Sequence, residues 1–229
     1  MTTLLMTRPE AQGRAFLTAL QDAAGPVAAV QSPLLEIEPR DWQPRRAYRH
    51  VVITSANALP ALARAPGLPV LAVGPRTAAL ARDAGHPAQE FGGDVEALFR
   101  AITDTPPEGP LIHLRGEVSR GDLAERLTQA GIETDQAVVY RQRPRPLTAA
   151  ALTLLAGSAP VLAPVFSPRT GALLAEAGPF MAPLDLVAIS PAAAEALAPL
   201  RARSLTIAAQ PNGEAMLTAC LERLRANGP

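Results

Sequence analysis

The segment Val51-Val-Ile-Thr-Ser-Ala-Asn-Ala-Leu59 decides the fold, because an apolar strand passes through a small polar turn into a helix. The same construction follows in Val70-Leu-Ala-Val-Gly-Pro-Arg-Thr-Ala-Ala-Leu80. It returns twice, in the same order, in segments 164–174 and 184–197. This paired repeat predicts two similar α/β domains. Open parallel sheets bind ligands beyond the carboxyl ends of their strands, so the polar turns predict a site in a cleft between the domains.

Short apolar strands alternate with helical stretches along the rest of the chain, which is typical of parallel sheets covered by helices. Segment 111–114 is expected to be one of these strands, with Arg115-Gly116 as its turn. Segment 40–49 breaks the pattern, and its Trp42 and Tyr48 are expected to anchor it to its own domain.

Domain sizes indicate that one domain is discontinuous. A single cut after residue 143 would leave 143 and 86 residues. Joining 1–36 to 144–229 instead gives 122 residues, with 107 in the inserted domain 37–143, and both are ordinary sizes. The chain then crosses twice, at 34–40 and 138–144, in an antiparallel ribbon that we expect to act as the hinge. In this ribbon Glu36 and Glu38 are expected to face Arg141 and Arg143.

Composition excludes several classes of function. Arginine supplies all 21 basic residues, so a lysine Schiff base, a pyridoxal anchor and a P-loop lysine are impossible. These 21 basic residues balance 21 acidic ones, which predicts no binding of nucleic acid. The chain has no apolar run of the ~20 residues that span a bilayer and no pattern of a secretion signal. Its single Cys220 excludes an internal disulfide and fits a reducing cytoplasm. The protein is also expected to be a monomer.

Metal and cofactor sites are not expected. His50, His86 and His113 are scattered over unrelated segments without ligand spacing. The Gly92-Gly93 turn lacks the dinucleotide fingerprint. Cys220 lies in an apolar helical stripe, which favours a core position over a nucleophile.

Eight short segments follow one another along the chain. They are Thr7-Arg8-Pro9, Pro33-Leu-Leu-Glu-Ile-Glu-Pro39, Ile53-Thr-Ser-Ala-Asn-Ala58, Val73-Gly-Pro-Arg-Thr-Ala78, Leu114-Arg-Gly116, Val139-Tyr140, Val165-Phe-Ser-Pro168 and Ala188-Ile-Ser-Pro191. In their order and spacing they resemble the uroporphyrinogen-III synthase family. The resemblance implies two flavodoxin-like domains joined by a two-stranded antiparallel linker. It also implies the cyclisation of hydroxymethylbilane to uroporphyrinogen III, with ring D inverted and water lost, without metal or organic cofactor.

The same resemblance makes Tyr140 the candidate catalytic residue. The candidate substrate-binding residues lie at or just after predicted strand ends, where helix N-termini and guanidinium groups suit carboxylates. They are Thr7, Arg8, Ser55, Ala56, Gly74, Arg76, Thr77, Arg115, Gly116, Ser167 and Ser190. Arg169 lies in a similar position.

Structural roles compete with these assignments. Ser55 and Thr77 are also ordinary helix-cap residues, Arg8 could pair with a neighbouring carboxylate, and Tyr140 could merely cap a strand. Two positions depart from the repeat, since Ala193 occupies the place of Thr77 and Phe166 that of Thr54. We therefore expect more side-chain donors in domain 37–143. The alternative function is a non-catalytic two-domain module that binds a small anionic ligand in the same cleft.

Overall fold

A computed structural model describes residues 2–118 and 121–226 as two α/β units. Unit 1 consists of Met1–Glu36 with Arg143–Pro229, and unit 2 of Ile37–Gln142. Each unit has its own sheet, covered by helices on both faces. The strands are parallel except for β3 at the edge of the unit 2 sheet. This architecture confirms the predicted α/β class.

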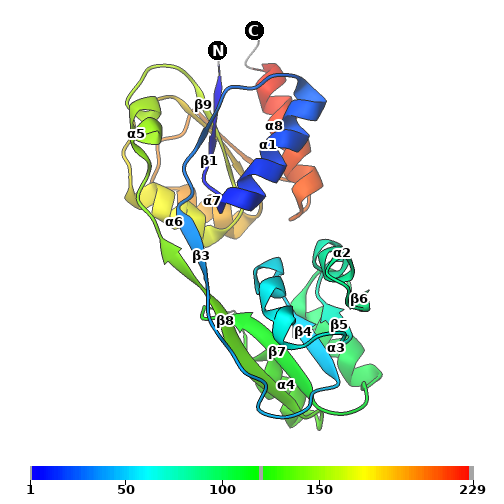
Figure 1. The fold of residues 1–229 in the computed structure, drawn as a ribbon. Coiled ribbons are helices and arrows are strands. Elements are labelled where there is room, and N and C mark those ends of the chain that lie inside the picture. The colour runs from blue at the N-terminus through cyan, green and yellow to red at the C-terminus, as the bar shows by residue number, and fades with distance from the viewer. Residues whose placement is uncertain (1, 119–120, 227–229) are drawn as a thin grey trace. The chain divides into compact units, whose positions relative to one another are not determined.

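Unit 1 is built on five parallel strands in the spatial order β2-β1-β9-β10-β11. The neighbouring strands β1 and β9 are labelled in Figure 1. Their bounds are β1 Thr3–Met6, β2 Ala29–Gln31, β9 Val161–Val165, β10 Leu184–Ala188 and β11 Ser204–Ile207. Helices α1 (Glu10–Ala24) and α8 (Gly213–Ala226) cover one face, where Leu4 and Met6 are fully buried. The other face packs against α5 (Ala149–Leu155), α6 (Pro168–Glu176) and α7 (Pro191–Leu197).

Unit 2 contains a six-stranded sheet in the order β3-β8-β7-β4-β5-β6. Their bounds are β3 Leu35–Pro39, β4 His50–Ile53, β5 Val70–Ala72, β6 Ala88–Glu90, β7 Leu111–Gly116 and β8 Thr134–Pro144. The 3-10 helix η1 (Ala56–Arg64) and α2 (Pro75–Asp83) cover one face, and α3 (Val95–Asp104) and α4 (Leu123–Gln129) cover the other.

Apart from the edge strand β3, the two sheets have the same five-strand arrangement, but the chain passes through the five strands in a different sequence. In unit 1 the strands read 2-1-3-4-5 by order of appearance, which is the flavodoxin-like order. In unit 2, β8-β7-β4-β5-β6 occupy the same places, but the first two places are filled by the last two strands. Unit 2 is therefore a circular permutation of unit 1, in which β7 corresponds to β1 and β4 to β9.

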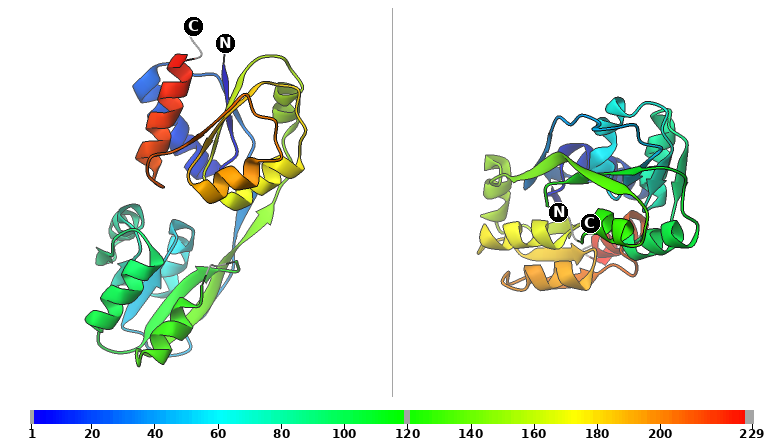
Figure 2. Two further views of the ribbon diagram at one scale, coloured as in Figure 1. Left: turned by 180° about the vertical axis from the view of Figure 1, so that it is seen from behind. Right: turned by 90° about the horizontal axis from the view of Figure 1, so that it is seen from below.

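Strands β3 and β8 lie side by side and run in opposite directions (Figure 2). The amide of Arg40 donates to the carbonyl of Val139, whereas that of Arg145 donates to the carbonyl of Leu34. Glu38 pairs with Arg141, as predicted, and Glu36 reaches Arg145 at 3.2 Å, a pairing that was not predicted. Exposed pairs of this kind contribute about 0–1 kcal/mol each.

The helix expected after β4 is a 3-10 helix because it contains Pro60. Proline lacks the amide that an α-helix needs and clashes with the carbonyl four residues before it. The segment instead forms hydrogen bonds to carbonyls three residues earlier, such as the one from the Ala58 amide to the Ser55 carbonyl at 3.0 Å. A second expectation was wrong, since Arg115 and Gly116 are the last residues of strand β7 and not a turn.

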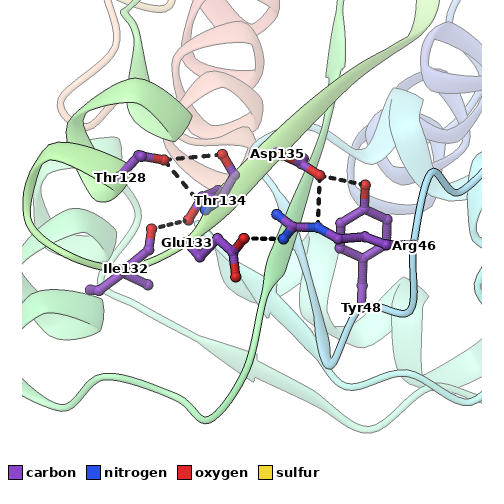
Figure 3. Close-up of polar contacts among 7 residues, drawn as sticks. All are labelled: Arg46, Tyr48, Thr128, Ile132, Glu133, Thr134 and Asp135. Carbon is purple, nitrogen blue, oxygen red and sulfur yellow. Dashed lines mark hydrogen bonds and ion pairs between the residues drawn. The ribbon is translucent and has the colours of Figure 1, made fainter.

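Segment 40–49 is anchored to unit 2, as expected. The Trp42 indole donates to the Ala61 carbonyl at 3.0 Å. At the amino end of β8, the Tyr48 hydroxyl donates to Asp135 at 2.7 Å and the Nε of Arg46 to the same carboxylate oxygen at 3.0 Å (Figure 3). Burial and the bond to Asp135 raise the pKa of Tyr48. This cluster lies at the amino end of β8, opposite to the carboxyl ends at which ligands of open α/β sheets bind.

Candidate functional site

Each sheet has a switch point at which the strand order reverses and the two neighbouring strands send their following helices to opposite faces. In unit 1 this point lies between β1, followed by α1, and β9, followed by α6. In unit 2 it lies between β7, followed by α4, and β4, followed by η1. Ligands of open α/β sheets bind beyond the carboxyl ends of the strands at such points. Candidate site residues are therefore expected near these two switch points.

At the switch point of unit 1, the Arg8 guanidinium stacks on the ring of Phe166, with 3.9 Å from Cζ to the ring centroid. Phe166 in turn meets Phe16 edge to face, with the ring centroids 5.0 Å apart. Leu4 of β1 pairs with Leu162 of β9. Arg8 and Phe166 each follow four residues later, so they lie at matching positions beyond the two strands. Stacking leaves the N–H donors of a guanidinium at its edges, where a carboxylate can accept two hydrogen bonds.

Two polar side chains of unit 1 are buried beside this point. Thr7, which follows β1, is fully buried, and Gln31 is the last residue of β2. Within the described residues, neither Thr7 Oγ1 nor the amide atoms of Gln31 have a hydrogen-bond partner. Buried polar groups are normally satisfied, so these atoms fit a place where a ligand or water supplies the partner.

At the switch point of unit 2, Arg115 occupies the position that Arg8 occupies in unit 1. It lies one residue past Leu114, which pairs with Ile53, so it is level with Thr54. Its Nε donates to Gln136 at 2.7 Å, and its Nη1 lies 2.9 Å from the Gly116 carbonyl oxygen and 3.3 Å from that of Glu117. This arginine is held by its own unit.

His113 lies below Arg115 on the same side of β7, with its Nε2 3.5 Å from the Thr54 hydroxyl. Burial lowers the pKa of His113 to about 4, and the charge of Arg115 contributes. The imidazole is therefore neutral near pH 7 and cannot serve there as a proton donor of ordinary strength. Its position makes it a support for Thr54.

Tyr140 lies on β8 with only 6% of its surface exposed. Its ring covers Gly116 so closely that a Cβ at Gly116 would come within 2.7 Å of Cζ and 2.9 Å of the hydroxyl oxygen. The amide of Glu117 donates to the Tyr140 carbonyl at 2.9 Å. The phenol is thus fixed at the carboxyl end of β7, beside the switch point of unit 2.

Three predicted serines act as helix caps. The hydroxyl oxygens of Ser55, Ser167 and Ser190 accept from backbone amides at 3.3, 3.1 and 3.3 Å. Ser55 therefore has the helix-cap role that competed with its assignment to the substrate site. Gly74 is the N-cap residue that precedes α2 and has no side chain for capping. The helix N-termini at these turns still present amides and a positive dipole end to anions.

The remaining candidates lie at the same carboxyl ends. Arg76 is exposed and Thr77 half-buried in the first turn of α2, and Ala56 begins η1. Sequence reasoning did not identify Phe166, His113 or Gln136 as contributors. The available signal was the period of two along a strand, which places His113 and Arg115 on one side of β7.

Groups of His, Cys, Asp or Glu that could hold a metal ion are absent from residues 2–118 and 121–226. No helix in these described ranges is long and apolar enough to cross a membrane. Burial raises the pKa of Cys220 to about 12, which makes it inert as a nucleophile at neutral pH.

The fold and these strand ends define a protein with two flavodoxin-like units, of which unit 2 is a circular permutation of unit 1. These units present arginines, helix N-termini and one tyrosine. A family model described as uroporphyrinogen-III synthase HemD matches residues 16–218. The chain therefore belongs to the uroporphyrinogen-III synthase family.

Solved structures share the fold. The uroporphyrinogen-III synthetase of Helicobacter pylori is 18% identical, with a TM-score of 0.68, over 97% of this chain and 100% of that one. A mutant uroporphyrinogen III synthase of Thermus thermophilus is 15% identical, with a TM-score of 0.54, over 99% of this chain and 100% of that one. No curated protein matches the chain by sequence.

Proposed function

We propose that this protein closes hydroxymethylbilane to uroporphyrinogen III, with inversion of ring D and loss of water, in haem biosynthesis. The observation that carries the proposal is the family match over residues 16–218. The geometry supports it, because the carboxyl ends of both sheets offer donors for carboxylates and one phenol.

The substrate carries eight carboxylates, whereas the chain has no net charge. Binding must therefore depend on local donors. Arg8, stacked on Phe166, can fork onto one carboxylate. Arg76 and the amides at the N-termini of α2 and α6 can hold others. Thr7, whose hydroxyl is buried beside Arg8, adds a neutral donor.

The chemical step removes hydroxide from a carbon that the neighbouring pyrrole already activates. Tyr140 is proposed to donate its phenolic proton to the leaving oxygen, so that water departs. The ring D α-carbon that carries the methylene bridge to ring C then attacks the activated carbon. The bond from that bridge to this α-carbon breaks and re-forms at the free α-carbon of ring D, which inverts the ring. The free α-carbon loses its proton to the Tyr140 phenolate, so the sum is the loss of one water. Only modest acid assistance is needed. The larger demand is to choose which ring D carbon attacks, which is a matter of positioning.

One assay separates the synthase from the non-catalytic binding module. Hydroxymethylbilane is generated enzymatically in the presence of the protein, and the products are oxidised and resolved by isomer. The synthase gives the type III isomer in excess. If type I alone forms, as it does without a catalyst, the chain is a binding module.

Further expectations belong to the same proposal. We propose that the hinge consists of segments 34–40 and 138–144. X-ray scattering with and without product tests whether the dimensions of the protein change on binding. The protein is proposed to act in the cytoplasm as a monomer that binds no nucleic acid, which the balanced charge and single buried Cys220 support. Light scattering on a size-exclusion column measures the oligomeric state.

A further inference from the structure

We propose that Arg115 is a positioning residue that fixes the phenol of Tyr140 through a β-bulge, and is not a ligand of the substrate. The inference rests on the proposed function only for its kinetic consequence. Its structural part concerns unit 2 alone.

The bulge lies where β7 meets β8. Arg115 pairs with Val138, but the next residue of β7, Gly116, pairs with Tyr140, so that β8 carries Val139 as an extra residue. Side chains alternate along a regular strand, yet Val139 and Tyr140 both belong to the core cluster that faces η1 and α2. A bulge re-aims a side chain in this way. Tyr140 owes its direction to this irregularity.

Arg115 holds the β7 side of the bulge. Its Nη1 lies 2.9 Å from the carbonyl oxygen of Gly116 and 3.3 Å from that of Glu117, two successive residues that follow it. Its Nε is bound to Gln136 of β8 at 2.7 Å. One guanidinium therefore ties the end of β7 to the neighbouring strand. A planar fork of donors suits this task, whereas the single ammonium group of lysine does not.

The clamped segment is the one that contacts Tyr140. Gly116 lies under the phenol ring, and the amide of Glu117 donates to the Tyr140 carbonyl at 2.9 Å. Glu117 also pairs with Arg40 at 2.9 Å. Any rotation of the Gly116 and Glu117 peptides would move both the Gly116 backbone that contacts the Tyr140 ring and the backbone of Tyr140 itself. Arg115 opposes that rotation through their carbonyl oxygens.

Spectroscopy tests the structural part without the reaction. The chain has two tyrosines, so 3-fluorotyrosine gives two ¹⁹F resonances, which Tyr48→Phe and Tyr140→Phe assign. Arg115→Gln should shift the Tyr140 resonance and leave that of Tyr48 in place. The matched control is Arg126→Gln, which removes an arginine bound to Glu96 in the same unit and should shift neither. An unmoved Tyr140 resonance in folded Arg115→Gln overturns the proposal.

A double-mutant cycle tests the kinetic part. Arg115→Gln should lower kcat for type III product about tenfold with KM unchanged, because the lost interaction acts on the reacting geometry. In a Tyr140→Phe background the same change should have less than a twofold effect. If Arg115→Gln lowers kcat by the same factor with and without the Tyr140 hydroxyl, or if it raises KM and leaves kcat unchanged, Arg115 binds the substrate independently of Tyr140.

Stability must be controlled in these experiments, because Arg115→Gln also leaves Gln136 and two carbonyl groups without a partner. Arg115→Lys keeps the charge and provides the second variant if Arg115→Gln does not fold. It should also shift the Tyr140 resonance and lower kcat. Full activity in Arg115→Lys contradicts the need for a fork of donors. If the unsubstituted protein forms no type III isomer but the resonances behave as expected, the proposed function fails and the positioning role stands.

Discussion

The two units place an arginine and a glutamine at the same positions of the same sheet and use them differently. In unit 1, Arg8 comes two residues after Met6, which pairs with Gln31. In unit 2, Arg115 comes two residues after His113, which pairs with Gln136. Arg115 binds its glutamine, whereas Arg8 stacks on Phe166 and the amide atoms of Gln31 find no partner among the described residues.

This difference indicates a division of labour between units of one architecture. In unit 2 the arginine stabilises an internal geometry, namely the bulge and the ring of Tyr140. In unit 1 an aromatic residue orients the arginine, and buried polar atoms lie beside it. We infer that, at the switch points, unit 1 contributes recognition of carboxylates through side chains whereas unit 2 contributes the phenol. This modifies the expectation from the sequence that side-chain donors concentrate in 37–143.

The largest effect is expected for Gly116→Val. Its side chain would overlap the Tyr140 ring, because even a Cβ would come within 2.7 Å of it. A displacement of this size should lower kcat about a hundredfold. The matched control is Gly213→Ala at the start of α8, whose added Cβ would meet no atom within 4 Å among the described residues. Steady-state kinetics of folded variants measures both, and equal activity of Gly116→Val and the unsubstituted protein would refute the close packing.

His113 should make stability depend on pH in a way that Met6, at the matching position of unit 1, cannot. Its folded-state pKa of about 4 lies below the usual 6.5, so the unfolded chain binds the proton more readily. Stability is therefore lost as pH falls from about 6.5 to 4, by roughly 3 kcal/mol. Urea unfolding at pH 7 and pH 4.5 measures the loss.

His113→Met installs the residue of unit 1 and supplies the control for this comparison. Its stability should fall less between the two pH values than that of the unsubstituted protein. The same loss in both proteins would show that His113 does not titrate as its burial requires.

Tyr140→Phe should lower kcat without abolishing the reaction. Removing the hydroxyl deletes the proton donor but leaves the ring, the bulge and the binding groups in place. We expect a decrease of about ten- to a hundredfold, at the low end for general acid catalysis. Complete loss in a folded variant would contradict a mechanism dominated by positioning. Isomer-resolved product analysis should still find type III in excess.

The sequence predicted the elements that depend on local pattern. Apolar strands, polar turns and helices follow each other regularly from Val51 onward, and their repetition predicted the parallel α/β class. Spatial order does not follow from such a pattern, so the permutation of unit 2 required the structure. The bulge at Val139 and the stacking of Arg8 on Phe166 join residues that are far apart in the chain, or depend on one extra residue in a strand. Periodicity contains neither kind of information.

The smallest effect is expected for Phe166→Leu, which removes the aromatic platform beneath Arg8. A cation–π contact contributes about 0.5–1 kcal/mol, so KM should rise about threefold with kcat unchanged. Leu173→Ala alters a partly buried residue of the same unit, packed on the other face, and serves as the control. If kcat falls instead while KM stays constant, Phe166 contributes to the chemical step and not to binding.

The most direct test of the division of labour is to measure kcat and KM for Arg8→Gln and Arg115→Gln side by side. We predict that Arg8→Gln raises KM about tenfold, the cost of a charge-assisted hydrogen bond, with little change in kcat. For Arg115→Gln we predict the reverse, a lower kcat at unchanged KM. The same kinetic parameter changing in both variants would contradict this division of labour.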